Sequence, residues 1–169
     1  MSEIKPSQKQ SIVNNCYFYP FIQRRLSSIT MISVTKKIEF EAAHRISNYP
    51  GTCSEIHGHT YKLEVTVSGE INRKTDMVMD FKNLKEILQK TVIAHFDHAL
   101  ILKRSRENQT IFSSYLGKIT WMESEPTAEQ MLVWMVSSIT PHLPSGVSLQ
   151  KLKLHETTGS FATWKNIKG

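Results

Sequence analysis

The chain has 169 residues, 40% of them hydrophobic, and its 21 basic and 15 acidic side chains give a formal net charge of +6. This length fits one domain that buries its own core, and the hydrophobic content excludes a wholly disordered protein. Two cysteines are too few for the disulfide framework of a small secreted fold. No apolar run reaches the roughly 20 residues of a membrane-spanning helix. The basic charge leaves a nucleic-acid-binding module as an open class.

Half of the excess positive charge lies at the N-terminus. Residues 1–30 hold four basic residues and one acidic residue, are rich in Ser, Gln and Asn, and show no periodicity. They also lack the apolar run of a signal peptide, and a transit peptide is a lesser alternative. We interpret 1–30 as a loosely ordered extension, or as the result of a start upstream of a natural start at Met31. We expect residues 31–169 to form a single domain, and by default we assign the protein to the cytoplasm.

The first regular pattern is typical of two β-strands. Even-numbered positions of 32–42 are apolar apart from one lysine, and this series ends at His44. After a loop, the odd-numbered positions of 57–67 form a second series, which starts with His57 and His59. We expect the two strands to pair as an antiparallel hairpin, which puts all three histidines on the apolar face of the strands.

Two helices are predicted further along the chain. Asp80 is a suitable N-cap for apolar residues at helical spacing that continue to about His95. The sequence Thr127-Ala128-Glu129-Gln130 fits a capping box, and Pro141 ends the helix that follows it. Between the helices, residues 103–125 are polar and mixed, which indicates a long connection with a short element near 111–116. With a final strand, the order of elements predicts an α+β fold with an antiparallel sheet and helices on one side.

The three histidines suggest a metal site. Residues two apart in a strand point the same way and lie about 6.5–7 Å apart, so His57 and His59 present two imidazoles on one face. His44, at the end of the neighbouring strand, supplies a third. Three neutral imidazoles around Zn²⁺ leave a fourth position open, which is the catalytic arrangement. The alternative is three unrelated histidines close to a turn.

Other reactive side chains are less specific. Cys53 lies four residues before His57, and a cysteine beside a cation can act as a base or nucleophile, although a small buried residue is the plainer reading. The neighbours Asp97 and His98 would suit a tuned proton carrier, but adjacent residues need not touch. Glu55, close to Cys53, is either an acid or a solvated loop residue.

Glu156 is more informative because it continues the apolar face of the last predicted strand, after Leu152 and Leu154. An unpaired buried carboxylate costs several kcal/mol. Glu156 is therefore either exposed at the strand end or satisfied by a ligand that carries several hydrogen-bond donors.

Six short segments occur in an order that resembles one known family, the 6-pyruvoyl-tetrahydropterin synthase / 6-carboxy-5,6,7,8-tetrahydropterin synthase family, from about residue 31 to the end. The segments are Phe40–Arg45, Cys53–Tyr61, Met79–Phe81, Phe96–His98, Pro126–Glu129 and His155–Thr157. The resemblance implies the tunnelling fold (T-fold), an α+β fold with a four-stranded antiparallel sheet and two helices on one face. It also implies trimers that pair into a homo-hexamer with active sites between subunits.

The resemblance also implies a role for each motif residue. It implies that Zn²⁺ is held by His44, His57 and His59. It makes Cys53 the base that abstracts a proton, and it lets a neighbouring subunit complete the proton relay with Asp97 and His98.

For substrate binding, the resemblance implies that Glu156 anchors a pterin ring, whose neighbouring N–H groups can donate two hydrogen bonds to one carboxylate. We count Thr127 and Glu129 as further substrate-binding residues, while capping and the helix dipole also account for them. The implied substrate is 7,8-dihydroneopterin triphosphate, and we expect neither a nucleic-acid partner nor a membrane partner.

The product distinguishes two branches of the family. The short C-x-x-x-H-G-H spacing from Cys53 to His59 resembles the bacterial branch, which feeds 7-deazaguanine and queuosine synthesis. That branch makes 6-carboxy-5,6,7,8-tetrahydropterin, acetaldehyde and triphosphate. The alternative is the pyruvoyl-forming enzyme, which eliminates triphosphate from the same substrate, and Glu55 keeps an aldolase-like variant open.

Overall fold

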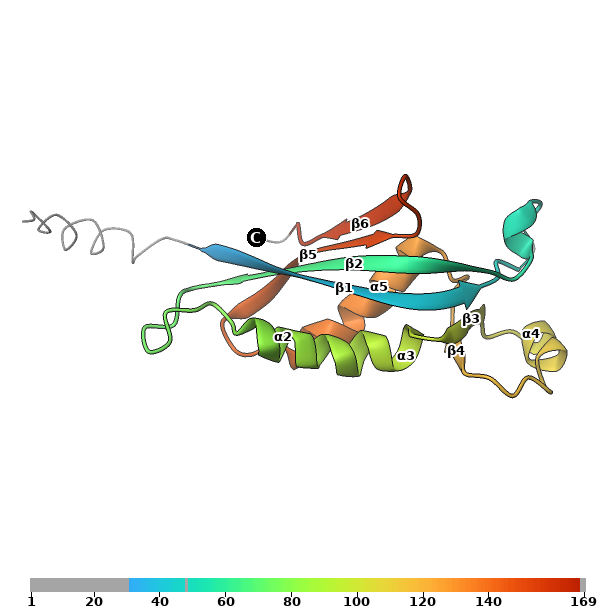
Figure 1. Cartoon of the computed structure of the whole chain (residues 1–169), viewed down its shortest axis with the longest axis horizontal. Helices are drawn as coiled ribbons and strands as arrows, with labels where there is room; N and C mark the ends of the chain where they lie inside the picture. Colours follow the sequence, from blue (N-terminus) through green and yellow to red (C-terminus); the bar gives the residue numbers. More distant parts are fainter. Residues whose placement is uncertain (1–30, 48, 168–169) are drawn as a thin grey trace, which may run out of the picture. The chain divides into compact units, whose positions relative to one another are not determined.

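The computed structural model describes residues 31–47 and 49–167 (Figure 1). The prediction made for residues 1–30 lies outside the described residues. The strands of the described part are β1 (Ile32–His44), β2 (His57–Gly69), β3 (Ala99–Lys103), β4 (Ile119–Met122), β5 (Val147–His155) and β6 (Phe161–Lys165). They form one sheet of six strands in the order β4-β3-β1-β2-β5-β6.

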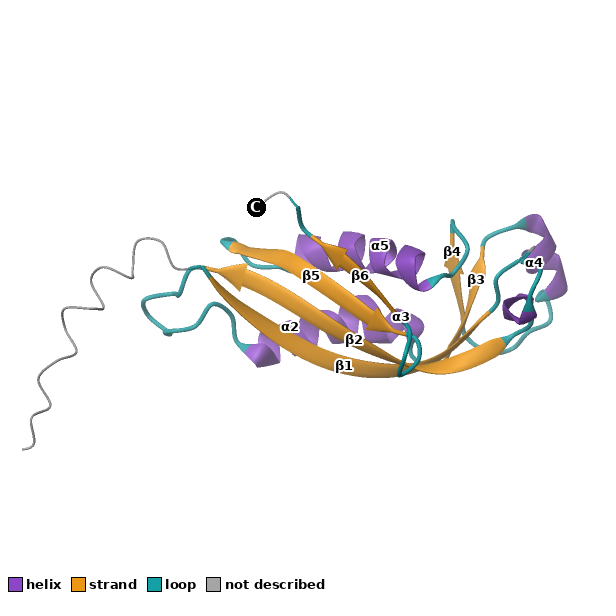
Figure 2. Cartoon of the chain, turned by 90° about the horizontal axis from the view of Figure 1, so that it is seen from above, coloured by secondary structure: helices purple, strands orange, loops and turns teal. Residues whose placement is uncertain are grey.

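Two long helical segments lie on the same side of the β1–β2–β5 part of the sheet (Figures 1 and 2). The first runs through α2, a π-helical turn and α3, and the second is α5; short helices complete the described part. Their bounds are α2 (Phe81–Leu88), η2 (Gln89–Ile93), α3 (Ala94–Phe96), α4 (Arg106–Ile111), α5 (Ala128–Ile139), η1 (Thr52–Ser54) and η3 (Thr140–His142). No helix in these described ranges is long and apolar enough to cross a membrane.

The predicted β1–β2 hairpin is confirmed. The strands pair antiparallel, with His44 opposite His57 and Ala42 opposite His59. Residues that lie directly opposite each other in such a pair share a face of the sheet. Burial alternates as expected along β1, where Ile38, Phe40, Ala42 and His44 are buried. The hairpin therefore brings the three histidines together at one end of the apolar face.

The predicted helices are also confirmed, with differences at their ends. The Asp80 carboxylate accepts a hydrogen bond from the Lys82 N–H at 2.7 Å, as an N-cap should. At the start of α5, the Thr127 hydroxyl accepts from the Gln130 N–H at 3.4 Å. The second half of the expected capping box is replaced, because the Thr127 N–H donates to the Glu125 carbonyl at 2.8 Å. Pro141 lies in η3, immediately beyond the end of α5.

The sheet differs from the predicted four antiparallel strands. Six strands form a mixed sheet in the described part, because β3 pairs parallel with residues 42–44 of β1 and β4 pairs parallel with β3. On the other side, β6 forms an antiparallel hairpin with β5. The short element expected near 111–116 is instead α4, at Arg106–Ile111, and β4 follows within the stretch predicted to be a connection.

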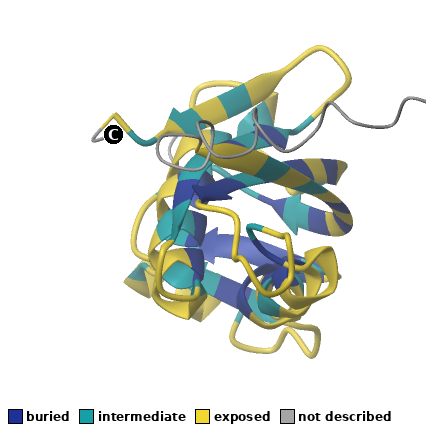
Figure 3. Ribbon diagram, turned by 90° about the vertical axis from the view of Figure 1, so that its left-hand side faces the viewer, coloured by how far each residue is buried: buried dark blue, intermediate teal, exposed yellow. Residues whose placement is uncertain are grey.

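The core fills the space between the apolar face of the sheet and the two helical segments. Figure 3 shows the buried residues in dark blue, gathered where these layers face each other. Phe40 and Tyr61 stack there at 5.1 Å between ring centroids, and Phe96 packs against Phe40. Each fully buried side chain of this size contributes about 1.5–3 kcal/mol of hydrophobic stabilisation. His44, with 1% of its surface exposed, is where this core becomes polar.

Candidate functional site

Three imidazoles meet at the end of the β1–β2 hairpin. The ring centroids of His44 and His57 lie 4.5 Å apart, and the ring of His59 lies 5.3 Å from His44 and 5.1 Å from His57. One ring nitrogen from each of the three lies within 4.8 Å of the other two. The sequence prediction brought together the same three residues.

Backbone carbonyls fix the orientation of two of these rings. His44 Nδ1 lies 2.8 Å from the Pro126 carbonyl oxygen, and His57 Nδ1 lies 2.9 Å from the Glu55 carbonyl oxygen. A carbonyl oxygen can only accept, so both Nδ1 atoms carry the proton and the neutral rings present unprotonated Nε2 atoms. These two Nε2 atoms lie 3.0 Å apart. Two facing lone pairs are an arrangement that a shared cation would satisfy.

The third ring leaves a nitrogen without a partner. His59 Nε2 is buried and has no hydrogen-bond partner among the described residues. Such a group costs about 1–3 kcal/mol if it stays unsatisfied. Three imidazole nitrogens, two of them on rings whose Nδ1 atoms are held by backbone carbonyls, suit Zn²⁺, which binds three protein ligands in catalytic sites and keeps one position open. The residues present therefore fit the metal that the family resemblance implies.

The electrostatics of the cluster favour neutral rings. Burial lowers the pKa of His44, because desolvation disfavours the charged imidazolium more than the Pro126 carbonyl and Glu156 favour it. Burial also lowers the pKa of His59, again against the attraction of Glu156. Neutral imidazoles are the form that binds metal, so the lowered pKa values of His44 and His59 favour metal binding by these two rings.

Glu156 extends this cluster from the turn that follows β5. Its Oε1 atom lies 3.4 Å from His44 Nε2 and 3.8 Å from His59 Nε2, and it accepts a hydrogen bond from the Tyr61 hydroxyl at 3.4 Å. Burial and the neighbouring carboxylate raise the pKa of Tyr61 well above its usual range, so this hydroxyl stays a donor. The Glu156 side chain is 27% exposed, and the Glu156 N–H is held by the Ser160 carbonyl. The carboxylate is thus positioned beside the rings and open to a ligand.

Cys53 lies in η1, in the loop that joins β1 to β2. Its carbonyl accepts a hydrogen bond from the Ile46 N–H at 2.9 Å, which closes the loop on the end of β1. The side chain is half-buried and free of a disulfide. Within the described residues no hydrogen bond joins the thiol to the histidines, and the contact of this loop with the cluster is made by the Glu55 carbonyl.

Asp97 and His98 lie elsewhere in the chain, after α3. Asp97 Oδ1 accepts from the Glu41 N–H at 3.1 Å and lies 3.1 Å from His98 Nδ1. These contacts hold the pKa of Asp97 below its ordinary value, although partial burial opposes them. The His98 side chain is 80% exposed and lines a groove of about 500 Å³ together with Glu41, Thr60 and Tyr115. Glu41 and Thr60 alternate with the inward-facing residues of β1 and β2, so their part of the groove lies on the opposite face of the sheet, while Ala42 and His59 also line the groove.

The two residues at the start of α5 are less directly connected to the cluster. Thr127 is occupied as the N-cap of the helix, and Glu129 is exposed in its first turn. The contact to the histidines comes instead from the preceding residue, through the Pro126 carbonyl. Backbone groups such as this one give no side-chain signal in the sequence. Tyr61 was also missed, although it follows His57 and His59 on the same strand face.

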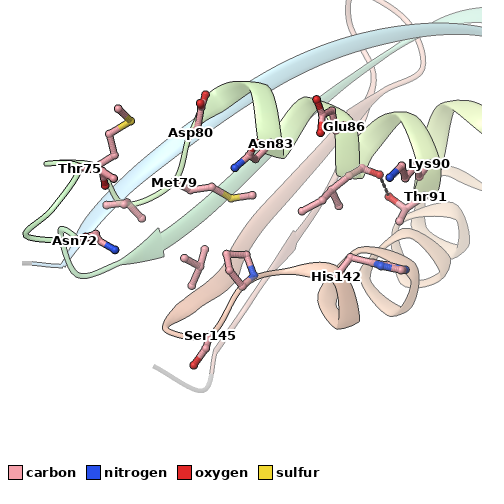
Figure 4. Close-up of a pocket in the computed structure, with 15 residues that line it drawn as sticks. Asn72, Thr75, Met79, Asp80, Asn83, Glu86, Lys90, Thr91, His142 and Ser145 are labelled. Atoms are coloured by element: carbon pink, nitrogen blue, oxygen red, sulfur yellow. Dashed lines mark hydrogen bonds between the residues drawn. The ribbon is translucent and has the colours of Figure 1, made fainter.

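A cavity of about 640 Å³ lies apart from this cluster, between α2–η2 and the segment from η3 to β5. Figure 4 shows Asp80, Asn83 and Glu86 on one side of it and His142 and Ser145 on the other. None of the sequence-predicted site residues lines this cavity. The candidate site is therefore identified by its chemistry and not by the size of a cavity.

Comparisons with known proteins agree with the motifs. Residues 33–166 match the family model of 6-pyruvoyl tetrahydropterin synthase. The chain belongs to the 6-pyruvoyl tetrahydropterin synthase family. This confirms the resemblance inferred from the sequence.

Relatives within this family carry two names. The 6-carboxy-5,6,7,8-tetrahydropterin synthase of Rickettsia typhi is 37% identical over 135 residues, which cover 78% of this chain and 98% of the relative. The 6-pyruvoyl tetrahydrobiopterin synthase of Pongo abelii is 31% identical over 144 residues, which cover 78% of this chain and 90% of the relative. The solved structure of the Caenorhabditis elegans 6-pyruvoyl tetrahydropterin synthase superposes with a TM-score of 0.60 at 21% identity, over 82% of this chain and 97% of that one. The fold is therefore that of the family.

Proposed function

We propose that residues 31–169 form a zinc-dependent 6-carboxy-5,6,7,8-tetrahydropterin synthase that acts in the cytoplasm, in queuosine biosynthesis. It converts 7,8-dihydroneopterin triphosphate and one water molecule into 6-carboxy-5,6,7,8-tetrahydropterin, acetaldehyde and triphosphate. The observation that carries the proposal is the convergence of the ring nitrogens of His44, His57 and His59 beside Glu156. The 37% identity to a carboxy-forming relative, against 31% to a pyruvoyl-forming one, supports the choice of product.

In this proposal the three histidines hold the metal, and backbone carbonyls hold two of the histidines. Zinc bound there supplies Lewis-acid chemistry, which polarises the hydroxyl groups of the substrate side chain. The carbonyls of Pro126 and Glu55 keep His44 and His57 in the tautomer that offers Nε2.

The substrate ring is held by Glu156. A carboxylate can accept two parallel hydrogen bonds from the neighbouring N–H groups of a pterin. The Tyr61 hydroxyl, which donates to Glu156 Oε1, orients this carboxylate from the core side. Thr127 and Glu129 complete the substrate-binding set, and the contact of Pro126 with His44 supports a position of this helix start close to the cluster.

Proton transfer is assigned to residues from two subunits. Cys53 removes a proton from a carbon of the substrate side chain, and the Asp97–His98 pair of a neighbouring subunit takes the proton onward. The 80% exposure of His98, in a groove that Glu41 and Thr60 also line, supports a contribution to a site other than that of its own chain. A site that takes catalytic residues from two subunits requires an oligomer, which we propose to be a homo-hexamer made from two trimers.

The direct test is product analysis on the zinc-loaded chain. After incubation with 7,8-dihydroneopterin triphosphate, acetaldehyde and triphosphate should appear in equal amounts, measured by a coupled alcohol dehydrogenase assay and by anion-exchange chromatography. The variant Cys53→Ala should lose turnover and keep its zinc. A pyruvoyl product without acetaldehyde would instead establish the alternative, 6-pyruvoyl-tetrahydropterin synthase. Turnover by Cys53→Ala would remove Cys53 as the base.

A further inference from the structure

A buried asparagine lies on α4, close to the end of β1. Asn108 has 0% of its surface exposed, whereas its neighbours Glu107 and Gln109 are exposed. Its Nδ2 group donates to the Ser47 hydroxyl at 3.1 Å and to the Lys103 carbonyl at 2.9 Å. Its Oδ1 atom accepts from Arg45 Nη1 at 3.4 Å. Both the NH₂ group and the oxygen of the amide are thus hydrogen-bonded. Asn108 is therefore the centre of a buried polar network, which also contains Arg45, Ser47 and the Lys103 carbonyl.

Arg45 connects Asn108 to the loop that contains Cys53. Arg45 directly follows the metal-ligand candidate His44, and its Nε donates to the Ser54 carbonyl at 2.9 Å. The adjacent carbonyl, that of Cys53, accepts from the Ile46 N–H. Two consecutive carbonyls at the cysteine are therefore held by residues 45–46, and Asn108 in turn holds the guanidinium of Arg45.

Ser47 forms a second arm of the same network. Its hydroxyl accepts from Asn108, and its N–H donates to Glu125 Oε2 at 2.8 Å. Glu125 also pairs with Lys103 at 3.4 Å. The next residue, Pro126, contributes the carbonyl that contacts His44 Nδ1. The buried amide is thus linked by hydrogen bonds to the Cys53 loop and, through the chain, to the group that orients a histidine.

We propose that Asn108 is a positioning residue that fixes the Cys53 loop through Arg45, and so sets where the thiol lies relative to the three histidines. The inference rests on the proposed function for the role of Cys53 as the base. It gives a purpose to α4, which lies in the stretch that the sequence predicted to be a connection. A reacting group that is misplaced by about 1 Å loses roughly 100-fold in rate, so a loop that must deliver a base needs such a support.

The test compares two variants with one control in the full chain. Asn108→Leu keeps the number and branching of the side-chain heavy atoms and removes the hydrogen bonds, and Arg45→Lys keeps the charge and removes the planar donors. Gln109→Leu makes the same chemical change on the exposed side of α4 and serves as the control. The rate of Cys53 alkylation by iodoacetamide is read from the peptide between Arg45 and Lys62, which excludes Cys16.

Both variants should raise the alkylation rate of Cys53 by roughly threefold or more, because the loop opens more often. Their kcat should fall about 10- to 100-fold while KM stays within about twofold and zinc content is unchanged. The double variant should be no worse than Arg45→Lys alone, because both act through one chain of contacts. Gln109→Leu should match the wild type.

An unchanged alkylation rate in Asn108→Leu, or effects of the two variants that simply add, would overturn the proposal. If Asn108→Leu does not fold, Arg45→Lys decides by the same measurements. A wild-type chain without turnover would refute the proposed function, and the alkylation rates would still decide whether Asn108 holds the loop.

Discussion

At the scale of single residues, His59 holds the only buried side-chain nitrogen or oxygen that lacks a hydrogen-bond partner in the described part of the chain. Oε1 of Glu156 lies 3.8 Å from this Nε2 atom, which is too far for a hydrogen bond. Burial also lowers the pKa of His59, so protonation does not relieve the problem at neutral pH. The metal-free fold therefore carries a penalty at the position where a metal would bind.

This penalty predicts an unusual response to His59→Phe. The substitution keeps a ring and removes the unsatisfied nitrogen, so the metal-free chain should lose no stability and should gain up to about 1 kcal/mol. Zinc affinity should fall at least 100-fold, because one of three ligands is gone. Urea unfolding in the presence of a chelator measures the first effect, and competition with a zinc indicator measures the second. The exposed His142→Phe is the control, and a clear loss of metal-free stability in His59→Phe would contradict the argument.

The same scale shows how much of the site the sequence could predict. Alternation along two strands was sufficient to put His44, His57 and His59 on one face, and it predicted Glu156 at the end of another apolar face. It could not predict the groups that hold the rings, because the Pro126 carbonyl belongs to the backbone and comes from a distant part of the chain. Contacts of this kind depend on the tertiary fold and leave no residue-type signal.

At the scale of elements, the sequence correctly predicted the elements that depend on local patterns, and it did not predict the parallel pairing of distant strands. The β1–β2 hairpin and the capped helices follow from alternation, helical spacing and Asp80 and Thr127 as N-caps. The strand β3 is a short run of four apolar residues and Lys103, without alternation, and its parallel partner in β1 is more than fifty residues away. The sequence also did not predict the π-helical turn η2, because the apolar residues keep ordinary helical spacing through it. Within this turn the Thr91 hydroxyl donates to the Ile87 carbonyl.

Asp80 belongs to one of the segments that resemble the family, but in the structure its carboxylate caps the N-terminus of α2. We therefore predict that its role is in helix stability. Asp80→Ala should lower the free energy of unfolding by about 1 kcal/mol, since the Lys82 N–H loses its acceptor. Asp80→Asn should retain most of the stability, because asparagine caps helices nearly as well. Both variants should keep the wild-type kcat. Urea unfolding and the product assay measure these quantities, and a large loss of kcat in Asp80→Asn would mean that the carboxylate serves the reaction.

At the scale of the whole molecule, the charge of +6 no longer points to nucleic acid. Half of the excess belongs to residues 1–30, outside the described part. Among the described residues, several basic side chains form ion pairs with acidic ones, such as Lys37–Glu64 and Arg104–Glu123. Such mixed surface charge is ordinary for a small-molecule enzyme, and surface pairs of this kind contribute little to stability. Removal of 1–30 would locate any residual nucleic-acid binding in that segment.

Assembly is the whole-molecule property on which the proposed reaction depends. The histidine cluster and Cys53 belong to one end of the β1–β2 hairpin, whereas the exposed His98 lines a groove with Glu41 and Thr60, which point to the other face of the sheet. A side chain in that position can serve the cluster of a second copy. A closed symmetric assembly would then repeat the same junction at every subunit.

Mixing two inactive variants tests this arrangement. Cys53→Ala and His98→Ala should each be inactive, but a mixed assembly contains junctions that combine an intact Cys53 from one subunit with an intact His98 from its neighbour. Random mixing of equal amounts should restore about a quarter of wild-type activity, since each junction draws its two contributors independently. The control mixes Cys53→Ala with His57→Ala, where both lesions fall in the same half of the site and no activity should return. Mixed assemblies of full size without activity in the first pair would show that Asp97 and His98 do not act across subunits.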